Sequence, residues 1–216
     1  SKLIDSDSNG VWHDVIHSYP LFTQDHETAS VNLIIEDAGG NTSRCKKRTQ
    51  LEAAAVGDDV EWMVTEEGAG RVEKILPRRS LLSRPAKSGA TRPVAANIDQ
   101  LVAILAVKPN IDALLLDQYL IVCELQGITP LIVLNKTDLL DEAAKQKIDE
   151  LVANYQHLGY DLIKVSAKDK SGLQQLSQRL YDKISILVGQ SGVGKSSIIN
   201  ALIPDLALQT KVLSTV

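Results

Sequence analysis

The sequence predicts two domains of different class: a small all-β barrel up to residue 77, and a doubly wound α/β domain from residue 96. Before residue 77, apolar and polar residues alternate over short stretches such as SVNLIIE and DVEWMV, which is typical of strands with one buried face. After Ile98, continuous apolar runs alternate with segments of helical period. That second pattern indicates parallel strands covered by helices on both faces.

The first part of the chain is predicted to form a five-stranded barrel of the oligonucleotide-binding kind. Val60, Trp62 and Val64 fall on one side of a predicted strand, so Trp62 is expected to lie in the core rather than to stack on a ligand. The stretches EDAGGN and EEGAG supply glycines for the turns between strands. We therefore assign residues 1–77 to this barrel.

A segment rich in Pro, Ser and Arg, LPRRSLLSRPAKSGATRP, separates the two predicted domains. We expect residues 78–95 to be a linker. The chain of 216 residues is 44% apolar, enough for a core on each side of that linker. It contains no run of eighteen apolar residues, and its two cysteines, Cys45 and Cys123, lie far apart, which together favour a cytoplasmic protein.

Charge is distributed unevenly along the chain. Residues 41–95 carry eleven Lys and Arg against seven acids, whereas residues 1–40 carry one Lys against seven acids. Because phosphates are contacted by Lys and Arg, the basic middle indicates a polyanionic partner, although a solvated face would have the same composition. The candidate RNA-binding residues are Arg44, Lys46, Lys47, Arg48, Arg78, Arg79 and Arg84.

The segment GQSGVGKS has the spacing of a phosphate-binding loop. It follows the apolar run ISILV and opens the helical segment KSSIINALI, so backbone N–H groups and a helix N-terminus would surround one concavity. Lys195 would reach the β and γ phosphates and is the candidate catalytic residue, while the Ser196 hydroxyl would be a Mg²⁺ ligand. The predicted phosphate-binding residues are Gly189, Gln190, Ser191, Gly192, Val193, Gly194, Lys195, Ser196 and Ser197.

Two further motifs predict a guanine site. In NKTD, Asp138 could accept hydrogen bonds from guanine N1–H and the 2-amino group, a pairing that adenine cannot offer because its N1 is an acceptor. Asn135 would hold the loop, and the stem of Lys136 would lie along the base. In SAK, the next strand is followed by Ser166, Ala167 and Lys168, of which the Ala167 N–H could donate to guanine O6.

The order of these motifs is unusual because the base-reading loops precede the phosphate loop. Loops need only converge at one edge of a sheet, so this order predicts a circularly permuted GTPase domain over residues 96–216. Twenty residues follow Ser196, too few for switch regions, so we expect a partial domain. Two Asp-x-x-Gly matches, at Asp37 and Asp169, are interpreted as a turn and a helix cap rather than as Mg²⁺ ligands.

The segments NIDQLVAILAV, PLIVLNKTDLL, VSAKDKSGL and GQSGVGKSSIINALIP resemble the RsgA family of bacterial GTPases that depend on the small ribosomal subunit. The resemblance runs from about Ala55 to Pro204. It implies GTP hydrolysis stimulated by the subunit, contact with its 16S rRNA, a role in late subunit maturation, bound Mg²⁺ with GTP or GDP, and a monomer. The family's zinc module and switch histidine have no matching positions in this sequence.

Two other classes remain open at the level of sequence. One is a nucleic-acid-binding module with a regulatory guanine-nucleotide site, and the other is a P-loop ATPase or small-molecule kinase. A preference for guanine nucleotides would exclude the ATPase or kinase. GTP turnover stimulated by ribosomal subunits would exclude the binding module with a regulatory site. We expect the chain as given to bind GDP but to hydrolyse GTP poorly by itself.

Overall fold

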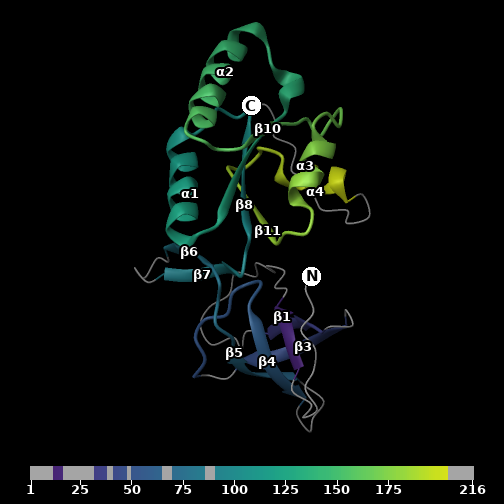
Figure 1. The fold of residues 1–216 in the computed structure, drawn as a ribbon. Helices are drawn as coiled ribbons and strands as arrows, with labels where there is room; N and C mark the ends of the chain where they lie inside the picture. Colours follow the sequence, from purple (N-terminus) through teal and green to yellow (C-terminus); the bar gives the residue numbers. More distant parts are fainter. Residues whose placement is uncertain are drawn as a thin grey trace. The chain divides into compact units, whose positions relative to one another are not determined.

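The computed structural model describes residues 12–16, 32–37, 41–47, 50–64, 70–85 and 91–203 (Figure 1). The chain divides into two compact units, residues 1–98 and 99–216. None of the helices in the described ranges combines the length and apolar character needed to cross a membrane.

The N-terminal unit contains a closed barrel of five strands in the order β1-β2-β3-β5-β4. Neighbouring strands run antiparallel except β3 and β5, which are parallel. The predicted alternation holds in β4 for Val60 and Trp62, which are buried, so the expected core position of Trp62 is confirmed; it fails at Val64, which is 62% exposed at the end of the strand. The strands are β1 Trp12–Ile16, β2 Asn32–Glu36, β3 Thr42–Lys47, β4 Asp59–Val64 and β5 Gly70–Ile75.

Residues 78–95, which were expected to form a linker, contain most of two paired strands. Strands β6 (Leu81–Pro85) and β7 (Thr91–Ala96) form a two-stranded antiparallel sheet. Proline usually argues against a strand because it lacks an N–H to donate, but a two-stranded sheet consists only of edges, where proline is tolerated. Pro85 pairs with Thr91 in this way, and Pro93 lies opposite Ser83, beside an irregularity in the register.

A largely buried ion pair between Arg78 and Asp58 stabilises the N-terminal unit. The guanidinium of Arg78 donates from Nε to Oδ1 of Asp58 at 2.6 Å and from Nη2 to Oδ2 at 2.8 Å. It also donates to the Ala53 carbonyl at 2.9 Å and to Glu52 at 3.2 Å. Asp58 is fully buried, and these contacts raise the pKa of Arg78 chiefly through the Asp58 hydrogen bond. Arg78, a candidate RNA ligand by sequence, is therefore committed to an internal structural role.

The C-terminal unit is built on a parallel sheet in the order β10-β9-β8-β11. Its central strand β8 is buried at every position, as expected for a strand covered on both faces. The strands are β8 Gln100–Ala106, β9 Thr129–Asn135, β10 Leu162–Lys164 and β11 Ser185–Val188. The helices are α1 Ala113–Gln126, α2 Glu142–His157, α3 Leu173–Leu180 and α4 Lys195–Leu202, with a 3-10 turn at Thr137–Leu139.

Helices cover both faces of this sheet: Figure 1 shows α1 and α2 on one side, and α3 and α4 on the other. Helix α1 begins where the Asp112 carboxylate accepts a hydrogen bond from the Leu115 N–H, and it ends at Gly127 in the left-handed conformation. On the other face, Leu176 of α3 and Ile198 of α4 pack into one core with Val133 and its neighbours. This packing fixes the carboxyl ends of β9, β10 and β11 along one edge.

Candidate nucleotide-binding site

The side chain of Asn135, the last residue of β9, joins the three loops at this edge. Its Nδ2 donates to the Val193 carbonyl in the glycine-rich loop at 2.8 Å, and its Oδ1 accepts from the Ala167 N–H in the loop after β10 at 3.3 Å. Only 1% of Asn135 is exposed, so both bonds are shielded from water. Motifs that are 58 and 32 residues apart in the chain are thus in direct contact.

The loop after Asn135 is held by its own backbone and by the neighbouring strand. Lys136 adopts the left-handed conformation, with φ of 60°, and its Nζ donates to the Lys108 carbonyl at 2.9 Å. The Thr137 hydroxyl donates to the Val165 carbonyl at 3.0 Å. These contacts fix the turn from which Asp138 projects.

The Asp138 carboxylate lies beside the loop that follows β10. Its Oδ1 accepts from the Ser166 hydroxyl at 2.9 Å, and its Oδ2 lies 3.8 Å from the Nζ of Lys168. Ser166 is fully buried, whereas 16% of the Asp138 side chain is exposed. Because each carboxylate oxygen can accept more than one hydrogen bond, the group keeps the capacity to receive two further donors from a planar ligand.

The glycine-rich loop between β11 and α4 has backbone conformations that require glycine at two points. Gly189 has φ of 145°, and a Cβ there would lie 2.3 Å from the Ile104 carbonyl oxygen. Gly194 has φ of 93°, and a Cβ there would lie 2.3 Å from Nδ2 of Asn135. The second glycine is therefore what allows the two loops to approach so closely.

Lys195, the first residue of α4, points back over this loop. Its Nζ donates to the carbonyls of Gly189 and Gln190, both at 2.8 Å, and burial lowers its pKa. Gly194 at the N-cap has no side chain to receive the first N–H groups of α4. A partly desolvated ammonium group beside a helix N-terminus is an arrangement suited to anionic oxygens such as those of phosphate.

Ser196 and Ser197 lie in the first turn of α4, half-buried next to Lys195. A hydroxyl at this place fits Mg²⁺, which takes few protein ligands and keeps oxygen ligands from water and substrate phosphates. Within the described ranges, no group of three or more His, Cys, Asp or Glu side chains could hold a metal ion by itself.

The structure also brings Tyr119 to the glycine-rich loop, a residue that the sequence motifs did not single out. Tyr119 lies in the middle of α1, and its hydroxyl is within hydrogen-bonding reach of the backbone of Gly189. Burial raises the pKa of this hydroxyl, and the Gly189 contact opposes that rise. In the sequence, Tyr119 lies within a stretch of helical period, DQYLIV, and no motif marks its hydroxyl as part of a site.

The two other Asp-x-x-Gly matches both have partners within local turns, so the turn interpretation of Asp37 is confirmed and the helix-cap interpretation of Asp169 is wrong, since the N-cap of α3 is Gly172. The Asp37 carboxylate accepts from the Asn41 N–H at 2.8 Å and from its side-chain amide. The Asp169 carboxylate accepts from the Ser171 N–H at 2.9 Å, and this contact lowers its pKa.

The candidate RNA ligands outside the nucleotide site have varied positions. Arg44 and Lys46 are exposed on β3, on either side of buried Cys45, and Arg79 is exposed. The Arg79 guanidinium donates to the Asn97 carbonyl at 2.8 Å. Arg48 lies outside the described residues, as do the side chains of Lys47 and Arg84.

A model of the RsgA GTPase family matches residues 75–216, which is most of the chain. The chain belongs to the RsgA GTPase family. Relatives named small ribosomal subunit biogenesis GTPase RsgA include one from Pseudomonas aeruginosa, 46% identical over 186 residues, and one from Azotobacter vinelandii, 43% identical over 191 residues. These alignments cover 86% and 88% of this chain, but only 55% and 56% of the relatives. The chain thus spans about half the length of the RsgA relatives that it matches.

Two solved structures extend the comparison to the fold. The crystal structure of YjeQ from Thermotoga maritima matches with a TM-score of 0.72 at 33% identity, over 93% of this chain and 68% of that one. The structure of YloQ, described as a circularly permuted GTPase, matches with a TM-score of 0.66 at 26% identity, with the same coverage of both chains. The predicted circularly permuted GTPase fold is thereby confirmed for this RsgA family member.

Proposed function

We propose that this chain binds GTP and GDP at the edge where Asn135 joins the three loops, and that it hydrolyses GTP during maturation of the small ribosomal subunit. The observation that carries the proposal is the Asn135 bridge, because it joins the base-reading loops to the phosphate loop. The names of the relatives support the biological role.

In this proposal each loop recognises a different part of the nucleotide. Asp138 would receive the N1–H and 2-amino donors of guanine, oriented by the hydroxyl of Ser166. When a nucleotide binds, the Lys195 ammonium group would donate to β and γ phosphate oxygens instead of to its two loop carbonyls. Because those carbonyls are neutral, no ion pair would be broken. Mg²⁺, held by Ser196, would supply charge neutralisation at the phosphates when bound.

The barrel would serve as the RNA-binding part. Its strand order, with β1 closing against β4 and β3 parallel to β5, supports assignment to the oligonucleotide-binding kind. Arg44, Lys46 and Arg79, which are exposed, are the described candidates for contact with 16S rRNA phosphates, with Lys47, Arg48 and Arg84 proposed from sequence alone. We also propose that the protein acts in the cytoplasm as a monomer.

GTP turnover with and without purified small ribosomal subunits tests the proposed role. We expect slow turnover by the chain alone, a many-fold increase with subunits, and loss of that increase in Lys195→Ala. Equal turnover in both conditions, together with intact GDP binding, would instead favour a nucleic-acid-binding module with a regulatory nucleotide site. Preference for ATP over GTP would contradict the guanine assignment.

A further inference from the structure

Helix α1 is apolar on the face that points away from the sheet as well as on the face that packs against it. The inner face buries Leu116, Leu120 and Cys123. The outer face carries three large side chains that are 68%, 58% and 76% exposed, namely Leu114, Ile121 and Leu125. We call these three residues the α1 face.

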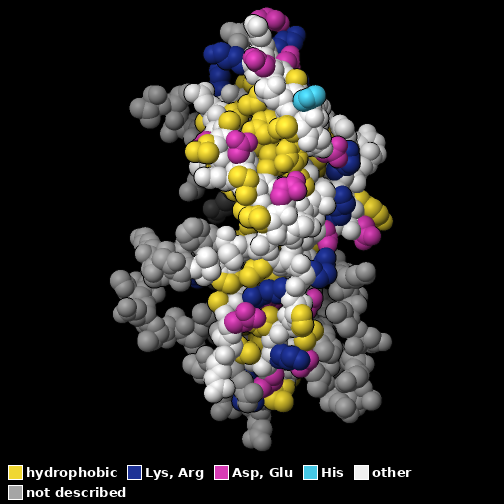
Figure 2. All heavy atoms as spheres, turned by 60° about the vertical axis from the view of Figure 1, so that its left-hand side comes forward, with side chains coloured by type: hydrophobic (Ala, Val, Ile, Leu, Met, Phe, Trp, Pro, Cys, Tyr) yellow, Lys and Arg dark blue, Asp and Glu magenta, His cyan; other side chains and the backbone are white. Residues whose placement is uncertain are grey.

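The three residues of the α1 face lie on one side of the helix, with the exposed Asp117 and Gln118 between Leu114 and Ile121. At about 100° per residue, the three side chains fall within roughly 40° of one another and lie opposite the buried side of the helix. A helix that covers a sheet normally presents polar residues to water, so an apolar outer stripe marks a surface that a partner covers. Figure 2 shows hydrophobic side chains gathered on the side of the molecule that carries α1 and α2.

A groove between α1 and α2 lies beside this stripe. Its volume is about 430 Å³, and its apolar lining comes from Ala113, Leu151 and Leu158. Leu158, just after α2, is 67% exposed. The Tyr155 hydroxyl donates to the Asp117 carboxylate at 2.7 Å, which ties the two helices together along the groove. The groove is an open depression with an apolar part that could receive an apolar side chain.

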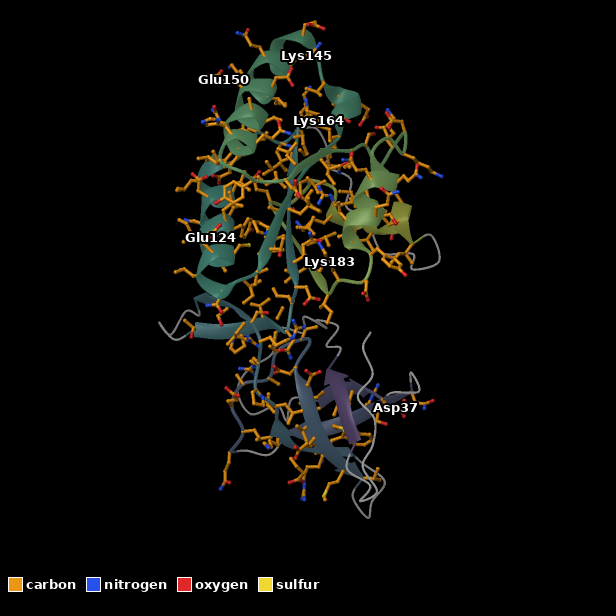
Figure 3. All side chains as sticks on the ribbon, viewed as in Figure 1. Asp37, Glu124, Lys145, Glu150, Lys164 and Lys183 are labelled. Atoms are coloured by element: carbon orange, nitrogen blue, oxygen red, sulfur yellow. The ribbon has the colours of Figure 1, made fainter. Side chains whose placement is uncertain are left out.

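The charges around this surface are mainly negative. Helix α1 contains two acids, Asp117 and Glu124, and no Lys, Arg or His. From α2, the groove is lined by Glu150 and by one cation, Lys147. Three carboxylates against one ammonium group give a net charge of −2. Figure 3 shows Glu124 and Glu150 projecting from the same side of the unit.

We propose that the α1 face and its groove dock a basic protein segment, an amphipathic helix whose apolar residues meet Leu114, Ile121 and Leu125 and whose Lys or Arg side chains meet Asp117, Glu124 and Glu150. The charge pattern selects this occupant. RNA phosphates would be repelled by the carboxylates, and a second copy of the chain would oppose like charges. The apolar stripe supplies the buried centre that such an interface needs, and the carboxylates supply its polar rim.

This inference rests on the proposed function, because it places the basic segment on a protein of the small ribosomal subunit. The test uses the full chain with a photoreactive benzoylphenylalanine at position 121 or 125, irradiated with purified small subunits. A matched control carries the same group at Gln175, an exposed position on α3. We expect cross-links from positions 121 and 125 to a subunit protein, and none to that protein from position 175.

Cross-links from positions 121 and 125 to rRNA, or to a second copy of the chain, would overturn the proposal. So would the absence of cross-links while the chain still sediments with the subunit. If the chain does not sediment with subunits at all, the proposed function fails, and the docking surface fails with it as a subunit contact. Co-sedimentation, measured in the same samples, distinguishes these outcomes.

Affinity provides a second readout. The triple variant Leu114→Gln, Ile121→Gln, Leu125→Gln changes only exposed side chains, so we expect the thermal midpoint and GDP affinity of the parent, with subunit affinity reduced about tenfold or more. The control Tyr181→Gln removes a side chain that is 82% exposed elsewhere in the same unit and should bind subunits as the parent does. Equal subunit affinity for the triple variant and the control would contradict the proposal.

Discussion

Arg78 in the N-terminal unit and Lys195 in the C-terminal unit are both partly buried cations, yet the structure uses them in opposite ways. Arg78 binds the fully buried carboxylate of Asp58, 20 residues away in the chain. Lys195 donates to two carbonyls of its own loop, at Gly189 and Gln190. The difference lies in the acceptors that each cation has.

The nature of the acceptors decides whether a cation can serve a ligand. If Arg78 turned toward an RNA phosphate, Asp58 would be left as an unpaired buried charge, which is costly. If Lys195 turned toward a phosphate, two loop carbonyls would lose one donor each, and the ammonium group would gain anionic acceptors. A basic residue is therefore a good candidate for phosphate binding only when its departure leaves no buried charge without a partner.

The largest expected effect is the loss of stability in Arg78→Ala. Removing the guanidinium leaves Asp58 buried without its partner, so the free energy of unfolding of the N-terminal unit should fall by about 3 kcal/mol or more. Denaturant unfolding followed by tryptophan fluorescence measures this, since both tryptophans, Trp12 and Trp62, belong to this unit. The control Lys74→Ala breaks an exposed pair with Glu61 at 3.6 Å and should cost less than about 0.5 kcal/mol. If both variants lost similar amounts of unfolding free energy, the claim that Arg78 has a structural role would be contradicted.

Lys195→Ala should give the opposite pattern. GDP affinity, measured by isothermal titration calorimetry, should fall about 100-fold, since charge-assisted bonds to phosphate are lost. The free energy of unfolding should change by less than about 1 kcal/mol, because the two carbonyls lie in a half-buried loop where water can donate to them in place of Lys195. A variant that bound GDP normally but unfolded easily would assign Lys195 a structural role like that of Arg78.

Gly194→Ala tests the close approach of the two loops with a smaller expected effect. A methyl group would meet Nδ2 of Asn135 and would impose a side chain on a residue with φ of 93°. We expect a loss of stability of about 1–2 kcal/mol and weaker GDP binding together. As a control, Gly159→Ala also has positive φ, at 90°, but no atom lies within 4 Å of its Cβ. It should lose stability without loss of GDP affinity.

The smallest expected effect concerns Cys123, a fully buried thiol in α1. Burial, and to a lesser extent Glu124, raises the pKa of this thiol from 9.0 to about 11. Its contribution to stability is therefore complete below pH 9 and is lost as the pH rises toward 11. Between pH 9 and pH 10 the parent should lose roughly 1 kcal/mol more stability than Cys123→Ala, measured by urea unfolding at a series of pH values. An identical pH dependence would contradict the assignment.

The sequence predicted the C-terminal fold well because its signals are local. The buried strands are apolar runs, and helices α1 and α2 end near Gly127 and Gly159, so the order of elements could be derived without long-range information. The same holds for the loops at Asn135 and Gly189, whose spacing reflects backbone requirements. The strands that contain Pro85 and Pro93 could not be predicted in this way, because nothing local shows that they pair in a two-stranded sheet, which tolerates proline.

Features that depend on long-range partners could not be derived. The bond between Arg78 and Asp58 joins residues whose proximity follows only from the folded barrel, so composition alone suggested an RNA ligand. Contact between Tyr119 and Gly189 likewise depends on how α1 lies on the sheet. The exposure of the outer face of α1 could not be predicted either. A helix with apolar residues on all sides is expected to be buried on all sides, and only the structure shows which side packs against the sheet.

Nucleotide selectivity tests most directly whether the loops at Asn135, Ser166 and Gly189 form one guanine site. Calorimetry should compare GDP, ADP and xanthosine diphosphate for the parent and for Asp138→Asn. The parent should prefer GDP, and the variant should prefer xanthosine diphosphate, because an amide donor at position 138 complements the 2-oxo group of xanthine. Unchanged preference in the variant, or equal binding of ADP and GDP by the parent, would show that Asp138 does not read the base of a nucleotide held by Lys195.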